Sequence, residues 1–322
     1  MKSKFMIAAA AIAMLMPIAA SAQFLGKNEE KTTGNSMPQN FWSAKPTKLN
    51  PYVAPNKPHW KLSEILATHK GKTDWVQPIV RNKHQEADYI SLGQGKKTKQ
   101  MMYGDDRVVF IVWDGALKVS IEGKEPFTAT KGFLVNVAPR LTYSIENTGR
   151  EPVVFFRVTP AGQMPSYPIT ETPPDNVPGW KYVKTAINDV GGYDALNTPY
   201  LDFNKDMVAA NAKGRPFLYD GHTSANMIRG MGVPTPPPTD WGHLHENMVE
   251  LWCIIEGKID VLVSGEQLVT GEVGDIIQAP NERWHRATSH EGGMATRLAI
   301  TPRHKEGQVH YYQEDYYTRR GQ

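Results

Sequence analysis

Apolar residues occur along this chain in short runs that are separated by glycine, proline and asparagine. Short apolar runs bounded by turn residues are typical of buried strands. The pattern predicts strands from about Ala87 to Thr159, and again from about Phe217 onward. Two other stretches, Lys61–His69 and Asp202–Ala212, have the character of short helices. We therefore expect a mostly β protein.

The pattern also repeats, with an offset of 142 positions. The segment V-V-F-I-V-W-D-G-A-L-K-V-S-I-E-G, from position 108, aligns with E-L-W-C-I-I-E-G-K-I-D-V-L-V-S-G, from position 250. The same shift superposes three glycine pairs and one Thr-Pro pair without a gap: Gly115 on Gly257, Gly123 on Gly265, Gly132 on Gly274, and Thr159-Pro160 on Thr301-Pro302. An internal repeat of this kind predicts two copies of one structural unit.

Four residues of the second copy have the chemistry of metal ligands. Because side chains alternate between the faces of a strand, His243 and His245 point the same way. Glu250 opens the next apolar run, and His285 follows a turn at Pro280. Three imidazoles and one carboxylate form a mixed nitrogen and oxygen site that suits a divalent transition metal.

The spacing of these residues resembles the two motifs of the cupin superfamily. The first motif, H-x-H-x(3,4)-E-x(6)-G, matches His243, His245, Glu250 and Gly257; the second, G-x(5)-P-x-G-x(2)-H, matches Gly274, Pro280 and His285. Glu282 stands where the second motif usually has glycine. The resemblance implies an all-β bicupin: two tandem double-stranded β-helix (jelly-roll) barrels with short helices and an extended N-terminal arm. It also implies one metal in the second barrel, with Fe, Mn, Ni, Co and Zn as candidates.

The first copy is expected to lack a metal site. The offset places the four ligand positions on residues that are mostly poor ligands for a divalent ion: Met101, Tyr103, Val108 and Tyr143. Two tyrosines remain possible ligands for ferric iron. The favoured role of this copy is structural, through packing against the second copy or through formation of a homo-oligomer.

The site suggests three classes of function. An octahedral ion held by four protein ligands keeps two open positions, which suits a dioxygenase acting on a small organic substrate, with an aromatic one among the candidates. The alternatives are a lyase, decarboxylase or isomerase, and a non-catalytic binding protein. Glu250 is the candidate catalytic base. Trp252 is expected to contact substrate or to be an ordinary packing residue, and Arg229 to bind substrate or to be a solvated charge. Arg283 is a second candidate for binding an anionic substrate near the metal, but a solvated charge at the rim is the favoured interpretation for it.

Composition and charge narrow the choice of partners. The formal net charge is +3, and removal of Lys2 and Lys4 with a leader lowers it to +1. A nearly neutral chain argues against nucleic acid as a partner, and the expected metal site makes a small-molecule substrate the expected partner. Cys253, the only cysteine, lies in an apolar run and excludes an intramolecular disulfide.

The N-terminus has the pattern of a secretory signal. A positive start, an apolar stretch and the small residues Ala20-Ser21-Ala22 predict cleavage after Ala22 and a periplasmic or secreted protein without a membrane anchor. A retained anchor is the alternative, although the apolar stretch is short. The predicted division of the chain is a signal peptide (1–22), an N-terminal extension (23–83), a first cupin domain (84–160), a connector (161–216), a second cupin domain (217–305) and a C-terminal tail (306–322).

Overall fold

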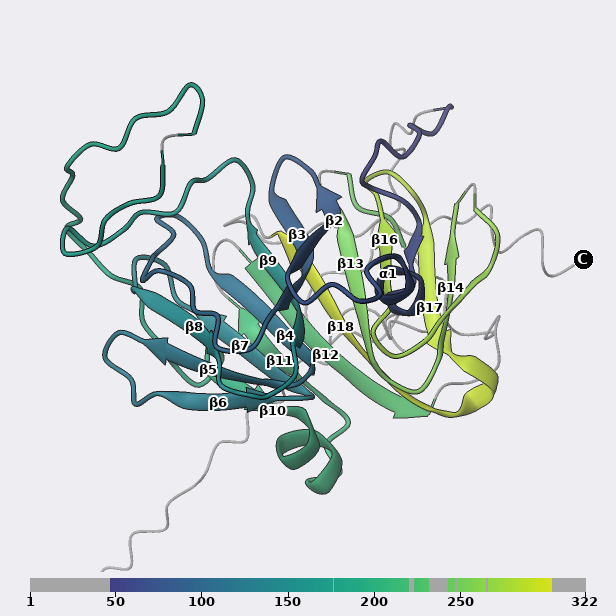
Figure 1. Cartoon of the computed structure of the whole chain (residues 1–322). Coiled ribbons are helices and arrows are strands. Elements are labelled where there is room, and N and C mark those ends of the chain that lie inside the picture. Colours follow the sequence, from purple (N-terminus) through teal and green to yellow (C-terminus); the bar gives the residue numbers. More distant parts are fainter. Residues whose placement is uncertain are drawn as a thin grey trace, which may run out of the picture.

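The computed structural model describes residues 47–175, 177–219, 223–231, 243–246, 248–264 and 266–302. Within these ranges the protein is mostly antiparallel β-sheet with few short helices, as the sequence predicts (Figure 1). No helix in the described ranges is long and apolar enough to cross a membrane. The predicted signal at 1–22 and the tail at 306–322 lie outside them.

The first barrel is made of a six-stranded sheet and a three-stranded sheet. The larger sheet has the order β10-β7-β4-β9-β3-β2 and the smaller one β6-β5-β8. The strands are β2 (Trp75–Arg81), β3 (Gln85–Leu92), β4 (Val108–Asp114), β5 (Ala116–Ile121), β6 (Phe127–Thr130), β7 (Phe133–Val137), β8 (Tyr143–Asn147), β9 (Val153–Pro160) and β10 (Tyr200–Asp202).

The second barrel repeats this arrangement. Its sheets have the orders β1-β16-β13-β18-β12-β11 and β15-β14-β17. The strands are β1 (His59–Trp60), β11 (Gly214–Tyr219), β12 (Thr223–Met231), β13 (Glu250–Glu256), β14 (Ile259–Val263), β15 (Val269–Gly271), β16 (Ile276–Ala279), β17 (His285–Ser289) and β18 (Met294–Pro302).

The offset of 142 that the sequence shows is reproduced by the strands themselves. The bounds of β4 and β13 differ by this number at both ends, and so do those of β8 and β17. Gly115 and Gly257 both have positive φ, of 81° and 66°, and a Cβ at either would collide with the strand that opens opposite it. The aligned glycines are therefore required by the same turn in each barrel.

The two copies exchange their first strands. β1 belongs to the first copy by sequence, yet it pairs with β16 of the second barrel. β10, which the offset aligns with β1, pairs with β7 of the first barrel. A helix follows each exchanged strand: α1 (Leu62–Thr68) begins with Leu62 N bonded to Asp275 Oδ1 at 3.0 Å, and the π-helix η3 (Phe203–Ala209) follows β10. This exchange interlocks the two barrels.

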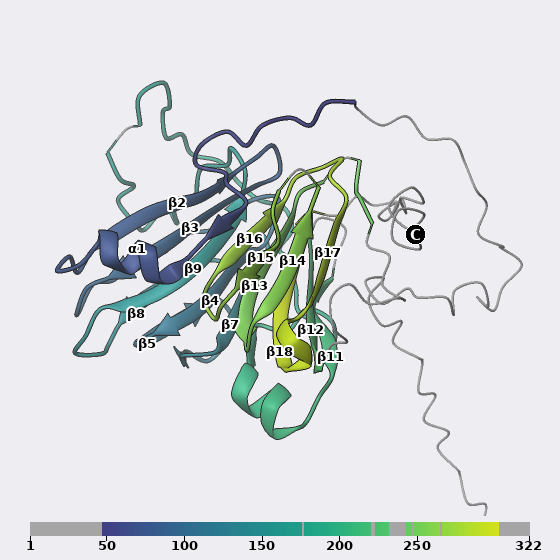
Figure 2. The ribbon, with the colours of Figure 1, turned by 90° about the vertical axis from the view of Figure 1, so that its right-hand side faces the viewer.

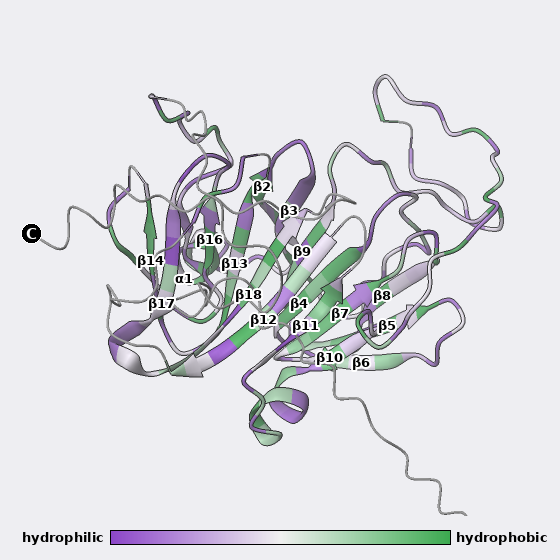
Figure 3. Ribbon diagram, turned by 180° about the vertical axis from the view of Figure 1, so that it is seen from behind, coloured by the Kyte–Doolittle hydropathy of each residue, from purple (hydrophilic) through white to green (hydrophobic). Residues whose placement is uncertain are grey.

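The apolar core consists of three clusters. Each barrel has one inside, and the third and largest lies where the outer faces of the two large sheets meet. That interface contains residues from both copies, among them Tyr89, Phe156 and Leu251, and the Tyr89 hydroxyl donates to the carbonyl of Gly274. Figure 2 shows the two large sheets side by side, and Figure 3 shows apolar residues along β4, β9, β13 and β18. The predicted packing of the first copy against the second is confirmed.

Both barrels begin earlier in the chain than the domain bounds predicted from the sequence. Residues 75–81, placed in the N-terminal extension, form β2 and pair with β3 of the first barrel. Residues 214–216, placed in the connector, open β11 of the second. Both predicted helices exist, as α1 and η3. The strands β2 and β11 are both edge strands that contain a proline, Pro78 in β2 and Pro216 in β11, and proline weakens the strand pattern in the sequence.

Glu282 occupies the left-handed conformation that the glycine of the second motif would adopt, with φ of 63°. Arg140, at the aligned position, has φ of 61°. Because this region is strained for residues with a Cβ, we expect Glu282→Gly to raise the free energy of unfolding by about 0.5–1 kcal/mol. Glu282→Ala, which keeps the Cβ, is the control and should bring no gain. Chemical denaturation of the wild type and the two variants measures their free energies of unfolding. If Glu282→Gly and the wild type were equally stable, the backbone at Glu282 would not be strained.

Candidate metal centre

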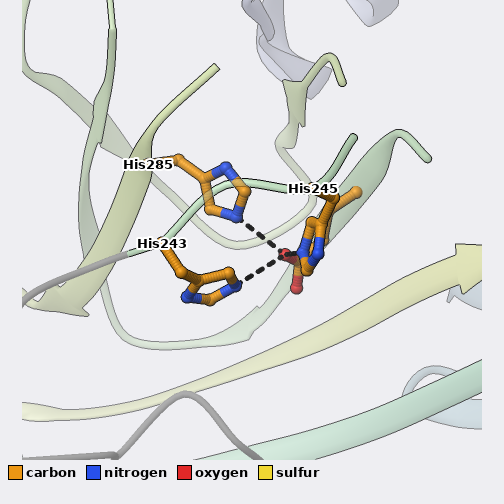
Figure 4. A group of neighbouring side chains, drawn as sticks. His243, His245 and His285 are labelled. Atoms are coloured by element: carbon orange, nitrogen blue, oxygen red, sulfur yellow. Dashed lines mark hydrogen bonds and ion pairs between the residues drawn. The ribbon is translucent and has the colours of Figure 1, made fainter. Parts of the chain in front are cut away.

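Three strand segments bring the four predicted ligands together. The backbone of His243 pairs with that of His285, with N to O distances of 3.0 and 2.8 Å. His245 lies two residues further on the same face, and Glu250 is the first residue of β13. Figure 4 shows the three imidazole rings directed toward one another and toward one carboxylate. Residues distant in sequence thus meet because the barrel places these strand ends side by side.

The distances fit a shared ion. Glu250 Oε2 lies 3.2 Å from His245 Nε2, 3.1 Å from His285 Nε2 and 3.9 Å from His243 Nε2. One ligand atom from each residue lies within 4.8 Å of the others. An octahedral ion with bonds of about 2.1 Å separates its ligand atoms by roughly 3.0 Å for neighbours and roughly 4.2 Å across. The four side chains can therefore hold a metal with only small adjustments.

The centre is buried, and its carboxylate is ionised. His243, His245, Glu250 and His285 are 4%, 2%, 2% and 1% exposed. Burial opposes ionisation of Glu250, but hydrogen bonds from His245 and His285 and the charges of those imidazoles outweigh it. They hold the pKa of this carboxyl well below its usual value. A buried carboxylate among three imidazoles is a chemical environment that a divalent cation matches.

Two contacts outside the ligand set orient the ligands. His285 Nδ1 lies 2.9 Å from the carbonyl oxygen of Arg283, so a proton on Nδ1 would be donated there and the lone pair of Nε2 would be left for a bound metal ion. The indole Nε1 of Trp252 donates to Glu250 Oε1 at 3.1 Å. Oε1 is thereby held on one side, while Oε2 faces the three imidazoles. The carboxylate is positioned to bind through one oxygen.

Trp252 shares the inward face with Glu250, as the strand alternation predicts. Its ring is 1% exposed and lies in T-shaped contact with His285, at a centroid distance of 5.2 Å. The structure therefore places this tryptophan inside the packed barrel and against two ligands. A contact with substrate stays a prediction.

Arg229 lies away from the centre. Its Nε and Nη2 donate to Glu256 at 2.8 and 3.2 Å, and Nη1 donates to the carbonyl of Ala212. The register of β12 and β18 sets Arg229 opposite Thr296, whereas Glu250 lies at the far end of β13. The structure does not bring this guanidinium together with the metal ligands.

Arg283 is not the solvated rim charge that the sequence analysis favoured, and that prediction is wrong. It is 5% exposed and donates to Ser264 O and Glu266 Oε1, at 3.1 and 3.0 Å, and to Asn50 O. Its guanidinium also stacks on Tyr52. It fastens the N-terminal segment to the loop that carries His285. Sequence reasoning missed Asn50 and Tyr52 because their segment has no periodic pattern.

The first barrel has the predicted residues at the equivalent positions. Met101 pairs with Tyr143 in an isolated bridge, as His243 does with His285. Val108 opens β4 as Glu250 opens β13. In the part of the chain that the structure describes, the His243 group is the one cluster found with the composition and spacing of a metal site. The aligned positions are thus confirmed.

Comparison with known proteins gives a clear result for the fold. No family model and no curated protein matches the sequence. Among solved structures, a salicylate 1,2-dioxygenase from Pseudaminobacter salicylatoxidans matches with a TM-score of 0.52 and 12% identity, over 76% of this chain and 83% of that one. A cupin 2 conserved barrel domain protein from Leptotrichia buccalis matches with a TM-score of 0.48 and 12% identity, over 76% of this chain and 96% of that one. An oxalate decarboxylase matches with a TM-score of 0.48 and 14% identity, over 80% of this chain and 80% of that one.

The two-barrel topology and the match to the salicylate 1,2-dioxygenase structure show that the chain has a bicupin-like fold with two jelly-roll regions. Its C-terminal region carries a buried group of three histidines and one glutamate that can hold a metal ion. The expected fold class is confirmed.

Proposed function

We propose that this protein is a metal-dependent bicupin dioxygenase acting on a small organic substrate, with aromatic compounds as the first class to test. The observation that carries the proposal is the convergence of His243, His245, Glu250 and His285 in a buried barrel. The likeness to a salicylate 1,2-dioxygenase supports the choice of substrates to try, although it extends to the fold alone at this identity.

In this proposal the four side chains hold one divalent metal, with iron as the first candidate. The imidazoles bind through Nε2 and Glu250 through Oε2. When bound, the metal would supply two exchangeable positions, for a substrate oxygen and for dioxygen. The surrounding barrel keeps bulk water from the ligands, since each is at least nine-tenths buried. This set of donors fits iron, manganese, nickel, cobalt and zinc, so elemental analysis of the purified protein has to identify the metal.

Glu250 is assigned first as a ligand and second as a base. Oε2 faces the imidazoles, and Oε1 accepts the indole hydrogen bond of Trp252. To take a proton from substrate, the carboxylate must release one of these contacts. Acid–base chemistry draws less support than oxygen chemistry, because Glu250 is held on both oxygens and the guanidiniums of Arg229 and Arg283 are engaged elsewhere.

Oxygen consumption tests the function. Protein purified without added metal is analysed for metal content, reloaded with Fe(II), and given salicylate, catechol and related aromatic compounds in an oxygen electrode. We expect oxygen uptake that matches substrate loss and that disappears in His245→Ala. Substrate turnover without oxygen would instead identify a lyase or isomerase. Metal binding with no turnover under either condition, across carboxylate and sugar substrates as well, would identify a binding protein.

We also propose that the mature protein acts in the periplasm or outside the cell, after cleavage following Ala22. The support is the pattern of the first residues, which lie outside the described ranges. Mass spectrometry of the protein from a cell fraction would locate its N-terminus. Association into a homo-oligomer is a further proposal, which size-exclusion chromatography with light scattering tests.

A further inference from the structure

A short segment precedes each of the two exchanged strands and is tied to both barrels. In the first copy this segment, the N-terminal strap, is formed by residues 50–58 and leads into β1 beside β16 (Figure 1). The hydroxyl of Tyr52 donates to the carbonyl of Gln278 on β16 of the second barrel, at 2.8 Å. Asn56 exchanges two hydrogen bonds with the backbone of Arg81 on β2 of the first barrel, at 2.8 and 3.0 Å.

The second copy has an equivalent strap, formed by residues 191–199 before β10. The hydroxyl of Tyr193 donates to the carbonyl of Asn136 at 2.9 Å, and the offset of 142 aligns Asn136 with the strand residue that the first strap binds. Asn197 exchanges two hydrogen bonds with the backbone of Tyr219 on β11, at 3.2 and 2.9 Å, as the asparagine of the first strap does with β2. Because the two straps are built alike, a difference between them is informative.

Arg283 is the difference. The offset aligns it with Leu141, which packs against the apolar core of the first barrel. The guanidinium of Arg283 is buried, donates to the carbonyl of Asn50 in the N-terminal strap and lies 4.7 Å from the centre of the Tyr52 ring. It also pairs with Glu266 at 3.0 Å. Burial of a guanidinium is costly unless several partners hold it, so these contacts fix its place between the strap and the second barrel.

The backbone beside this guanidinium contacts two of the candidate metal ligands. The carbonyl oxygen of Arg283 lies 2.9 Å from His285 Nδ1, and the amide of Glu282 donates to the carbonyl of His245 at 2.6 Å. A group on the far side of a metal-binding imidazole sets the orientation of its ring. A shift of Arg283 would therefore turn the His285 ring, although the guanidinium itself contacts no ligand.

We propose that Tyr52 and Arg283 are positioning residues of the metal centre, and that docking of the N-terminal strap and binding of the metal stabilise each other. The strap holds the guanidinium, the Arg283 backbone sets the ring of His285, and that ring supplies one of the four ligand atoms. Coupling between two equilibria is reciprocal, so a strap that strengthens metal binding is itself held more firmly when metal is bound. The proposal rests on the metal binding that the proposed function requires, and not on its oxygen chemistry.

The metal affinity of full-length variants tests the first half of this coupling. Competition with a chromogenic chelator measures the affinity for Zn(II). Tyr52→Ala removes the ring beneath the guanidinium, and Arg283→Leu gives this position the side chain found in the first barrel. Each should weaken Zn(II) binding by about 10–100-fold, as is typical when a group that orients a ligand is lost. Arg283→Lys keeps the charge and some of the hydrogen bonds, so it should recover part of the loss.

Tyr193→Ala is the matched control, because it breaks the equivalent contact of the second strap beside a barrel whose aligned positions are mostly non-ligating. It should bind Zn(II) as the wild type does. A purely structural role of the straps would instead give Tyr52→Ala and Tyr193→Ala equal losses of affinity, and that result would overturn the proposal. Wild-type affinity in folded Tyr52→Ala and Arg283→Leu would overturn it as well.

Hydrogen exchange in the wild type tests the second half and does not depend on whether a variant folds. With saturating Zn(II), the amides of residues 50–58 should exchange about tenfold more slowly than in metal-free protein, while those of residues 191–199 should keep their rates. Zn(II) binding without any slowing at residues 50–58 would refute the role of the strap alone. A wild type that takes up no Zn(II) would refute the metal centre itself, and the proposal with it.

Discussion

His245→Ala is expected to abolish metal binding, from about one ion per chain to a trace. The imidazole supplies one of four ligand atoms, and its Nε2 lies 3.2 Å from Glu250 Oε2 inside a closed group. Removing it leaves three ligands and a buried carboxylate with one fewer hydrogen-bond donor. Elemental analysis of dialysed protein measures the stoichiometry, and competition with a chromogenic chelator measures the affinity.

His69→Ala is the matched control for this experiment. His69 stacks on Trp75 and lies outside the ligand group, so its loss should leave the metal content unchanged. Circular dichroism must show that both variants keep the fold. If folded His245→Ala retained a full equivalent of metal, the four-ligand centre would be refuted.

Trp252→Ala is expected to lower the free energy of unfolding by about 3–5 kcal/mol, as is usual for a buried aromatic side chain. The indole is 1% exposed and packs in the apolar cluster of the second barrel. Its removal leaves a cavity beside His285 and takes the indole hydrogen bond from Glu250. Denaturant unfolding of metal-free protein measures the loss. A loss of unfolding free energy smaller than about 1 kcal/mol would show that the site relaxes easily. It would favour the interpretation that Trp252 contacts substrate rather than packing in the core.

Trp252→Phe separates packing from hydrogen bonding. The phenyl ring keeps most of the apolar contact, but it cannot donate to Glu250 Oε1. We expect a folded protein whose metal affinity is about 10–100-fold weaker, as is typical when a group that orients a metal ligand is lost. The d–d absorption of cobalt-loaded protein should shift as the carboxylate reorients. Trp113→Phe, in the core between the barrels, is the control, and an unchanged affinity and spectrum in Trp252→Phe would remove the orienting role.

The two copies show how one fold supports different interiors. The turns and strands that close each barrel are kept: Gly132 and Gly274 have φ of 92° and 90°. The interior positions differ freely, because they face the barrel lumen rather than the ladder of backbone hydrogen bonds. A fold fixed by glycines and outer-sheet packing can therefore carry a group that could hold a metal in one barrel and mostly non-ligating residues at the aligned positions of the other.

The sequence by itself determined the repeat, the fold class and the four residues that could bind a metal ion. The repeat is readable because glycines with positive φ tolerate few substitutes, so Gly115 and Gly257 mark the same turn. The ligands are readable because His243 and His245 share a face by strand alternation, and because the motif spacing places Glu250 and His285 at strand starts. These are local properties of short segments.

Only the tertiary structure decided which distant groups meet. The exchange of β1 and β10, the contact of Asn50 with Arg283, and the pairing of Arg229 with Glu256 each depend on the register and packing of separate sheets. The hydrogen bond of Trp252 to Glu250 depends on rotamers that the barrel interior selects. Hydrophobic periodicity records which face of a strand is buried, but not which side chain of another strand lies against it. That choice is made by the packed barrels.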